Sequence, residues 1–201
     1  MVKSNLGKIG DGVSTANASW KFDKTIVKIF DKHITKSVPF YIEGQQLVTQ
    51  ISDYFIKEDS ICYELGCSTG SLTYKLATRN KNKKKAKFIG IDIEKSMIKV
   101  AKKKKSTNLN FIHSDILKYK LKKSDLIIAY YTIQFVRPSD RQKLFNKIFS
   151  SLNYGGAFIL FEKTRAKDAR FQDIFTGLYN EYKLEKNYTP AEIFNKTRSL
   201  K

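Results

Sequence analysis

The chain has 201 residues, which predicts one domain, and 41% of them are hydrophobic, which excludes a disordered or low-complexity chain. It contains no run of about 18 apolar residues, so neither a transmembrane helix nor a membrane partner is expected. The polar N-terminus lacks the apolar segment of a secretory signal, so we expect a cytoplasmic protein.

Charge is the abnormal property of the composition. Lys and Arg number 38 against 19 Asp and Glu, a net charge of +19. Such a field attracts polyanions, but the lysine clusters at 81–87 and 102–105 contain no aromatic side chains that could stack on bases. We therefore favour solvated lysine faces over a dedicated nucleic-acid site and expect direct RNA binding to be weak. Cys62 and Cys67 form no CxxC pair or Cys/His cluster, so no metal is expected.

An arm and two helices are expected before the main domain core. Residues 1–19 are polar and predict a flexible arm. Apolar residues recur at helical spacing over 21–34, with His33 on the polar, solvated side, and the SVP segment at 37–39 breaks this helix. A second amphipathic helix follows and carries Phe55 on its apolar face.

From residue 58 onward, short apolar runs alternate with helical stretches, which predicts a doubly wound, mostly parallel α/β sheet. The strand at 124–133 lacks polar alternation, as burial on both faces requires. Further strands are expected at 61–65, 86–92, 109–114 and, after a Gly-Gly turn, 157–163. Helices are expected at 72–80, 94–105, 138–152, 167–184 and 190–197. Residues 20–201 are thus interpreted as one domain with a helical cap at 20–57, an α/β core at 58–163 and C-terminal helices at 164–201.

The segment YELGCSTGS at 63–71 follows the first core strand and opens the next helix. Gly66 and Gly70 allow a tight turn and close approach of the backbone to a ligand, but their spacing differs from the dinucleotide fingerprint GxGxxG. Asp92 ends the second strand, where a carboxylate can accept both hydroxyls of a ribose. Asp115 and the amide after it follow the third strand, where they can meet the edge of an adenine. These groups converge at the carboxyl edge of the sheet.

This constellation resembles the class I S-adenosyl-L-methionine (SAM)-dependent methyltransferase superfamily. The resemblance implies a Rossmann-like fold and SAM as the ligand of the crevice. Glu64, at the end of the first strand, would orient the loop or meet the amine of SAM. The alternative interpretation is a glycine turn with two Asp residues that only cap helices.

A closer resemblance extends over most of the chain. The segments that carry it are WKFDKTIVKIFDKHITKSVPFY (20–41), ELGCSTGS (64–71), TIQFVRPSDRQ (132–142), LNYGGAFILFEK (152–163) and the pattern YNEYK…Y…EI…KTRS (179–199). They look like the carboxy-S-adenosyl-L-methionine (carboxy-SAM) synthase family of bacterial tRNA wobble-uridine modification. The resemblance implies that SAM and prephenate give carboxy-SAM without a protein nucleophile, because prephenate supplies CO2 and the base. It also implies a homodimer.

The resemblance assigns roles to individual residues. Arg198 matches the Arg that binds the new carboxylate, which a guanidinium can bind through two hydrogen bonds, and in the family this Arg comes from the neighbouring subunit. Tyr41 matches a Tyr on the cofactor side. The family's SAM loop, ribose pair and adenine-edge pair correspond to Gly66, Cys67, Ser68, Asp92, Ile93, Asp115 and Ile116.

Two features depart from the family pattern. Tyr130 stands two residues before Thr132, where the family has an Asn, and its bulk affects the identity or pose of the ligand. The C-terminal strand hairpin of a full class I sheet is missing, which leaves the strand at 157–163 as an edge. Either the chain is a natural truncation or another subunit covers that edge.

Two other functions stay open. One is an ordinary SAM-dependent methyltransferase acting on a small molecule or RNA, although neither a DPPY-type tetrapeptide nor a Pro-Cys motif supports base methylation. The other is a non-catalytic, truncated SAM-fold protein that binds a partner. The nucleoside that copurifies with the protein distinguishes the three hypotheses.

Overall fold

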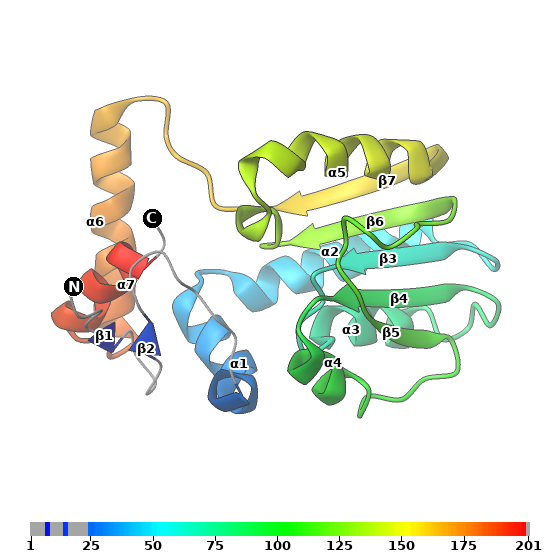
Figure 1. Ribbon diagram of the computed structural model, residues 1–201, viewed down its shortest axis with the longest axis horizontal. Coiled ribbons are helices and arrows are strands. Elements are labelled where there is room, and N and C mark those ends of the chain that lie inside the picture. The colour runs from blue at the N-terminus through cyan, green and yellow to red at the C-terminus, as the bar shows by residue number, and fades with distance from the viewer. Residues whose placement is uncertain (1–6, 9–13, 16–23, 200–201) are drawn as a thin grey trace. The chain divides into compact units, whose positions relative to one another are not determined.

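The computed structural model of the chain describes residues 7–8, 14–15 and 24–199 (Figure 1). The chain divides into two compact units, one formed by residues 42–163 and the other by the segments 1–41 and 164–201. Each unit is described by itself. Most of the arm expected at 1–19 lies outside the described residues.

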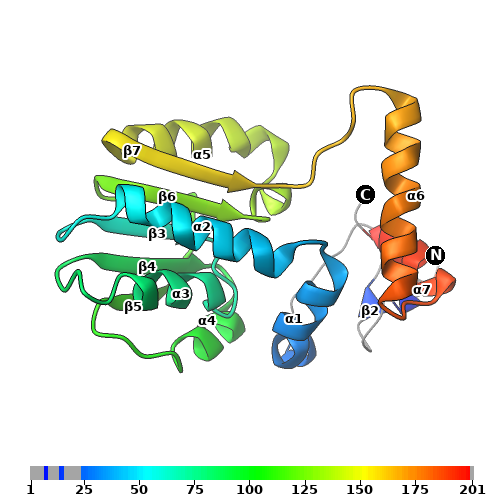
Figure 2. The same ribbon diagram turned by 180° about the vertical axis from the view of Figure 1, so that it is seen from behind.

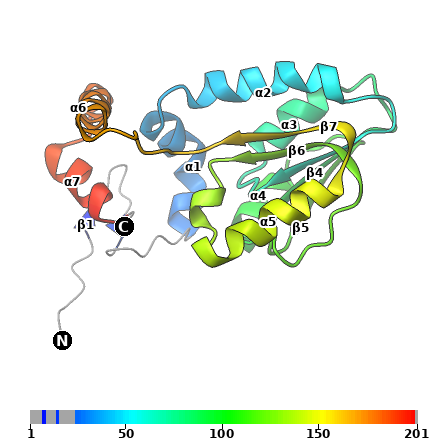
Figure 3. The same ribbon diagram turned by 90° about the horizontal axis from the view of Figure 1, so that it is seen from above.

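The unit 42–163 is a five-stranded, wholly parallel sheet with helices on both faces (Figures 1 and 2). Its strand order is β5-β4-β3-β6-β7, so the predicted doubly wound α/β class is confirmed. The strands are β3 (Ile61–Leu65), β4 (Lys87–Asp92), β5 (Leu109–His113), β6 (Ser124–Tyr130) and β7 (Leu152–Phe161). The helices are α2 (Tyr41–Phe55), α3 (Ser71–Arg79), α4 (Lys95–Ala101), the short 3-10 helix η1 (Ile133–Phe135) and α5 (Pro138–Ser151). The helices α2 and α3 cover one face and α5 covers the other (Figure 3).

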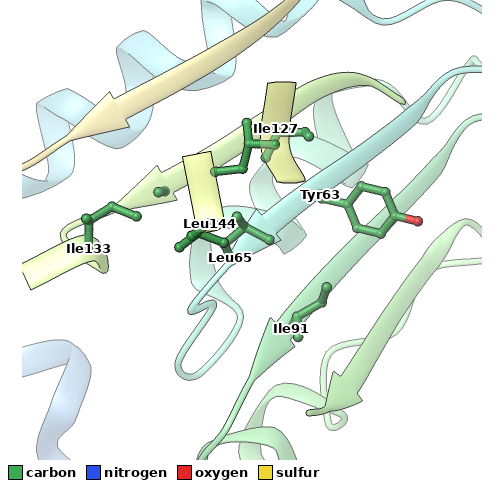
Figure 4. Close-up of a cluster of buried hydrophobic side chains, with 8 residues drawn as sticks. Tyr63, Leu65, Ile91, Ile127, Ile133 and Leu144 are labelled. Carbon is green, nitrogen blue, oxygen red and sulfur yellow. The ribbon is translucent and has the colours of Figure 1, made fainter. Parts of the chain in front are cut away.

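The core between the sheet and α5 is apolar, as the unbroken hydrophobic run of β6 predicts. Leu144 and Ile148 of α5 pack on buried side chains of β3, β4 and β6 (Figure 4). The sheet side of this cluster consists of Tyr63, Leu65, Ile91, Ile127 and Ala129. Full burial of a Leu side chain such as Leu144 stabilises the fold by about 1.5–3 kcal/mol, which fixes α5 firmly on the sheet.

Two element boundaries differ most from the sequence prediction, and the strand expected at 124–133 also ends earlier, at Tyr130. The helix α4 ends at Ala101, before the four consecutive lysines, because a helix continuing through them would have no apolar residue left to bury. The strand β7 begins at Leu152 rather than at 157. Gly155, with a φ of +77°, allows an irregularity within β7, and the pairing register with β6 shifts there.

The strand β7 lies at one end of the sheet, as predicted. It pairs with β6 alone among the described strands, and none of its side chains is fully buried. No helix in the described part of the chain has the length and apolar character needed to cross a bilayer.

The other unit contains β1 (Gly7–Lys8), β2 (Ser14–Thr15), α1 (Lys24–Ser37), α6 (Ala169–Glu185) and α7 (Pro190–Ser199), and β1 and β2 pair antiparallel. The prediction of a solvated His33 is wrong, because the side chain is only 2% exposed and meets the Tyr188 ring edge-on, 6.3 Å between centroids. Tyr179 Oη donates to the carbonyl of Ser37 at 2.9 Å, which connects α6 to the end of α1.

Candidate functional site

The candidate site lies in the unit 42–163, at the carboxyl ends of β3, β4 and β5. Both β4 and β6 pair with β3. After β3 the chain adds β4 and β5 on one side of this strand, and it then crosses back to add β6 and β7 on the other side. This is the switch point at which open α/β sheets form their ligand crevice, outside the carboxyl ends of the strands.

The glycine loop, residues 66–70, is held by main-chain hydrogen bonds. The amides of Gly66 and Cys67 donate to the carbonyl of Ile91 at 2.8 and 3.0 Å. Gly66 and Gly70 both have a φ of +73°, and a Cβ added at Gly66 would lie 2.4 Å from Thr132 Cγ2. Glycine is therefore required here by both backbone conformation and space, and the loop keeps its main chain open to a ligand.

Asp92, the predicted ribose ligand, is 7% exposed and is fixed by two amides. The amide of Ser68 donates to its Oδ2 at 2.7 Å and the amide of Glu94 donates to its Oδ1 at 2.8 Å. Burial raises the pKa of Asp92, and these two hydrogen bonds oppose that shift. Each carboxylate oxygen keeps a further lone pair, so two adjacent hydroxyls of a ribose can still donate to the carboxylate.

Asp115 and Ile116 form the turn after β5. The Oδ1 atom of Asp115 accepts from the amide of Leu117 at 2.8 Å, and its main-chain carbonyl accepts from the amides of Lys118 and Tyr119. One carboxylate oxygen thus shapes the turn, and the other is left for a donor such as the exocyclic amine of adenine. The predicted pair stands on the same edge of the sheet as Asp92, one strand further along.

Glu64 lies below the loop at the end of β3 and is 4% exposed. Thr73 Oγ1 donates to its Oε2. Burial raises the pKa of Glu64 to about 8, and the charge of Asp92 acts in the same direction while the Thr73 hydroxyl opposes it. The carboxyl group is therefore mainly protonated at neutral pH, and a cationic ligand group nearby would favour its ionised form.

With this geometry established, two comparisons identify the family. Residues 56–190 match the family model described as Methyltransferase domain. A carboxy-SAM synthase of Nautilia profundicola is 37% identical over 184 residues, which cover 90% of this chain and 77% of the relative. One of Campylobacter lari is 33% identical with the same coverage of both chains. The chain belongs to the carboxy-SAM synthase family.

The solved structures agree with this family in fold. The plantazolicin methyltransferase BpumL, solved in complex with SAH and a triazolic analogue, has a TM-score of 0.62 to this chain. The two share 20% identity, and the similarity covers 86% of this chain and 62% of BpumL. The chain therefore has the class I methyltransferase fold, and the resemblance found in the sequence to the carboxy-SAM synthase family is confirmed.

Two family positions remain: Cys67 in the glycine loop and Ile93 directly after β4. Burial raises the pKa of Cys67, so the thiol stays protonated, and Glu64 adds to the shift. Ile93 follows Asp92 and is 61% exposed, although His113 Nε2 donates to its carbonyl at 2.9 Å. An apolar side chain so exposed beside the ribose position is available to pack against a flat ring.

Tyr130, at the Asn position of the synthase family, points toward α2. A Cβ added at Gly44 would lie 2.4 Å from its hydroxyl oxygen, so the ring fits only because residue 44 is a glycine. Its ring also lies 4.9 Å from that of Phe161 and 5.0 Å from that of Tyr131, between centroids. Burial raises the pKa of Tyr130, so this hydroxyl stays protonated.

The two residues predicted for the reacting end, Tyr41 and Arg198, belong to the other unit. Tyr41 begins α2 and is half-buried. Arg198 lies in the last turn of α7, and its side chain lies outside the described part of the structure. The roles of both residues in the family therefore stay predictions.

Three further groups shape the site and were not predicted from the sequence. Thr73 binds the carboxyl of Glu64, Thr132 Oγ1 donates to the carbonyl of Leu65 at 2.8 Å, and Lys104 Nζ donates to the carbonyl of Thr69 at 2.8 Å. Lys104 stands in a run of four lysines, so no local signal marks it. In the described segments, no three His, Cys, Asp or Glu residues gather as a metal site would require.

Proposed function

We propose that this chain is a carboxy-SAM synthase, which makes carboxy-SAM from SAM and prephenate. The observation that carries the proposal is the collinear match to synthases of that name over 90% of the chain. The site adds physical support, because the glycine loop, Asp92 and the turn after β5 offer complementary groups to the three parts of SAM.

Each part of SAM has its own group in this proposal. The two ribose hydroxyls donate to the oriented carboxylate of Asp92, and the adenine lies against Ile93 with its edge at Asp115 and the amide of Ile116. The amino-acid part of SAM lies over the glycine loop, with its ammonium near Glu64. The ammonium favours ionisation of Glu64, so SAM binding near neutral pH, where the carboxyl of the free site is mainly protonated, releases a proton to the solvent.

The chemistry itself comes from the two substrates. Prephenate breaks down to phenylpyruvate, CO2 and hydroxide, and the hydroxide removes the methyl proton that CO2 replaces. The protein positions the reactants and stabilises charge, which suits a site whose thiol, Cys67, is kept protonated by burial. Tyr41 is proposed to lie on the cofactor side, as its family position implies.

Arg198 is proposed to bind the new carboxylate from a neighbouring subunit of a homodimer. Plain SAM has a methyl group where carboxy-SAM has a carboxylate, so only carboxy-SAM can use the guanidinium. Replacing Arg198 with Ala should weaken carboxy-SAM by about 1.5–3 kcal/mol more than SAM, as expected for a lost charge-assisted pair. Calorimetry with both ligands measures the difference. Arg198→Lys should recover only part of it, because an ammonium cannot bind a carboxylate through the two parallel hydrogen bonds that a guanidinium forms. Equal losses for the two ligands would remove Arg198 from the site, and full discrimination by a monomer would contradict its contribution from the neighbouring subunit.

The product is proposed to serve tRNA wobble-uridine modification, without tight binding of tRNA by this chain. The +19 charge predicts an electrostatic attraction that disappears near physiological salt. A titration of tRNA binding against salt concentration tests this, and tight, salt-resistant binding would favour a methyltransferase that acts on RNA.

Ordinary methyl transfer is the second candidate, and Tyr130 is the observation that favours it. The Asn of the synthases is replaced by a ring that packs on Gly44, so one hydrogen-bonding group of the family pattern is absent. Mass analysis of the nucleoside copurified with the protein separates the candidates. Carboxy-SAM supports the synthase, SAM or S-adenosylhomocysteine alone supports methyl transfer, and an empty protein that also fails to bind added SAM contradicts both.

A further inference from the structure

Lys147, on α5, makes a set of contacts that neither the family match nor the sequence pattern assigns. Its Nζ lies 3.0 Å from the carbonyl oxygen of Ile116, 2.6 Å from that of Leu117 and 2.7 Å from that of Tyr119. An ammonium has three protons, and here each has its own acceptor. All three acceptors belong to the turn that follows β5.

The three carbonyls converge on one point, and this requires a cation. Without Lys147 the negative ends of three carbonyl dipoles would face one another in a half-buried place. Burial lowers the pKa of Lys147, while the negative Asp115 acts in the opposite direction. The lysine stands between Leu144 and Ile148, which are both buried in the core, so the ammonium is presented by a helix that cannot easily move.

The same turn carries the adenine-side groups. Asp115 Oδ1 accepts from the amide of Leu117, whose carbonyl is one of the three that Lys147 binds. Lys147 also binds the carbonyl of Ile116, the residue whose amide lies on the adenine side in the proposed complex. The direction of the free Asp115 oxygen and of the Ile116 amide is thus set by a turn that Lys147 holds from the opposite side.

We propose that Lys147 is a positioning residue for adenine recognition, holding the turn 115–119 so that Asp115 and Ile116 read the purine edge. The inference rests on the proposed binding of SAM. Adenine presents a donating amine beside an accepting ring nitrogen, which fits a carboxylate oxygen beside an amide. Hypoxanthine presents the reverse pattern, an acceptor beside a donor. The turn should therefore set the preference for adenosyl over inosyl ligands.

The test compares S-adenosylhomocysteine with S-inosylhomocysteine by calorimetry. The wild-type protein should prefer the adenosyl ligand at least tenfold. In Lys147→Met the adenosyl affinity should fall about tenfold and the inosyl affinity less than about twofold, so that the preference nearly disappears. A purely structural role would weaken both ligands equally, and that result overturns the proposal. A wild-type protein that binds both ligands equally overturns it as well, and one that binds neither refutes SAM binding itself.

Two controls make the test specific to the ammonium. Lys143→Met removes an exposed lysine from the same helix, one turn earlier, and should leave the preference unchanged. Lys147→Cys, alkylated with 2-bromoethylamine, restores an ammonium on a side chain of nearly the same length, and should restore the preference. Cys62 and Cys67 are buried and protonated, and treated wild-type protein controls for their reaction. Failure of this rescue in a folded protein counts against the proposal.

Hydrogen exchange tests the tether without any ligand. The amides of Leu117, Lys118 and Tyr119 donate their hydrogen bonds to Asp115 only when the turn is closed. They should exchange at least tenfold faster in Lys147→Met than in Lys143→Met, while the amides of β6 remain unchanged. Unchanged exchange in the turn would show that apolar packing alone holds it, contrary to the proposal.

Discussion

The glycine loop after β3 and the turn after β5 reach the same edge of the sheet but are held in different ways. The glycine loop is held by main-chain bonds to Ile91 and by the Asp92 carboxylate, all from the adjacent strand β4. The turn after β5 is held by Lys147, from a helix on one face of the sheet. A loop fixed by its neighbours and by glycine can be recognised in a sequence, whereas a loop fixed by a distant side chain cannot.

The largest effect is expected at Gly66, where both the backbone conformation and the available space require glycine. In Gly66→Ala the new Cβ meets Thr132 and the backbone has a positive φ, so we expect a loss of about 3–5 kcal/mol of stability and no SAM binding. Gly155→Ala is the matched control, with a φ of +77° but nothing within 4 Å of its Cβ. It should cost only about 1 kcal/mol in denaturant unfolding, and equal losses for both would show that strain, not space, governs the loop.

The buried carboxyl below the loop should give a pH-dependent effect of about 4 kcal/mol between pH 4 and pH 8, because each pKa unit corresponds to about 1.4 kcal/mol. The pKa of Glu64 is about 8 in the fold and near 4.5 in the unfolded chain. Between these values only the folded state keeps the proton, so the stability of the wild-type protein falls as pH rises. Glu64→Gln lacks this dependence. Urea unfolding should give nearly equal stabilities at about pH 4 and a more stable variant at about pH 8, and a constant difference across the range would contradict a buried protonated Glu64.

The next largest expected effect is the loss of SAM affinity when the carboxylate that binds the ribose is removed. Asp92→Ala should lower SAM affinity by about 2–3 kcal/mol, roughly 30- to 150-fold, because two hydroxyls lose a charged acceptor. Asp53→Ala is the control, since its carboxylate pairs with Arg79 at 2.6 Å on the exposed surface of α2. Calorimetry that finds the two folded variants equal in SAM affinity would remove Asp92 from the site.

The smallest effect is expected at Lys104, a side chain distant in sequence that also holds the glycine loop. Lys104 Nζ donates to the Thr69 carbonyl at 2.8 Å, while Lys103 beside it is exposed. Lys104→Met should lower SAM affinity about three- to tenfold, and Lys103→Met should leave it unchanged in the same titration. If both change it alike, general charge rather than the hydrogen bond is responsible.

The sequence predicted the sheet well because its signals are local. The apolar run of β6 and the strand–helix alternation predicted a doubly wound parallel sheet, which the structure confirms, and glycine and Asp spacing located Gly66 and Asp92 at the carboxyl edge. Contacts made far along the chain could not be predicted. His33 has a polar neighbourhood in its own helix but packs on Tyr188, and Lys104 sits in a lysine run that continued the expected helix.

Tyr130 shows the same limit at the level of the family. The resemblance to the synthase family marks it as a departure, but only the structure shows that its hydroxyl lies against Gly44 and its ring against Phe161. Residue 44 lies far from 130 in sequence, and no spacing rule connects them. A contact between two such distant positions therefore cannot be predicted from the sequence and is found only in the packed structure.

The central claim is that this chain joins CO2 from prephenate to SAM. The most direct measurement incubates the purified protein with SAM and prephenate and follows the nucleosides and keto acids by mass spectrometry. The account predicts a product heavier than SAM by one CO2, formed together with an equal amount of phenylpyruvate and only when prephenate is present. A folded, SAM-binding protein that forms neither compound would contradict it.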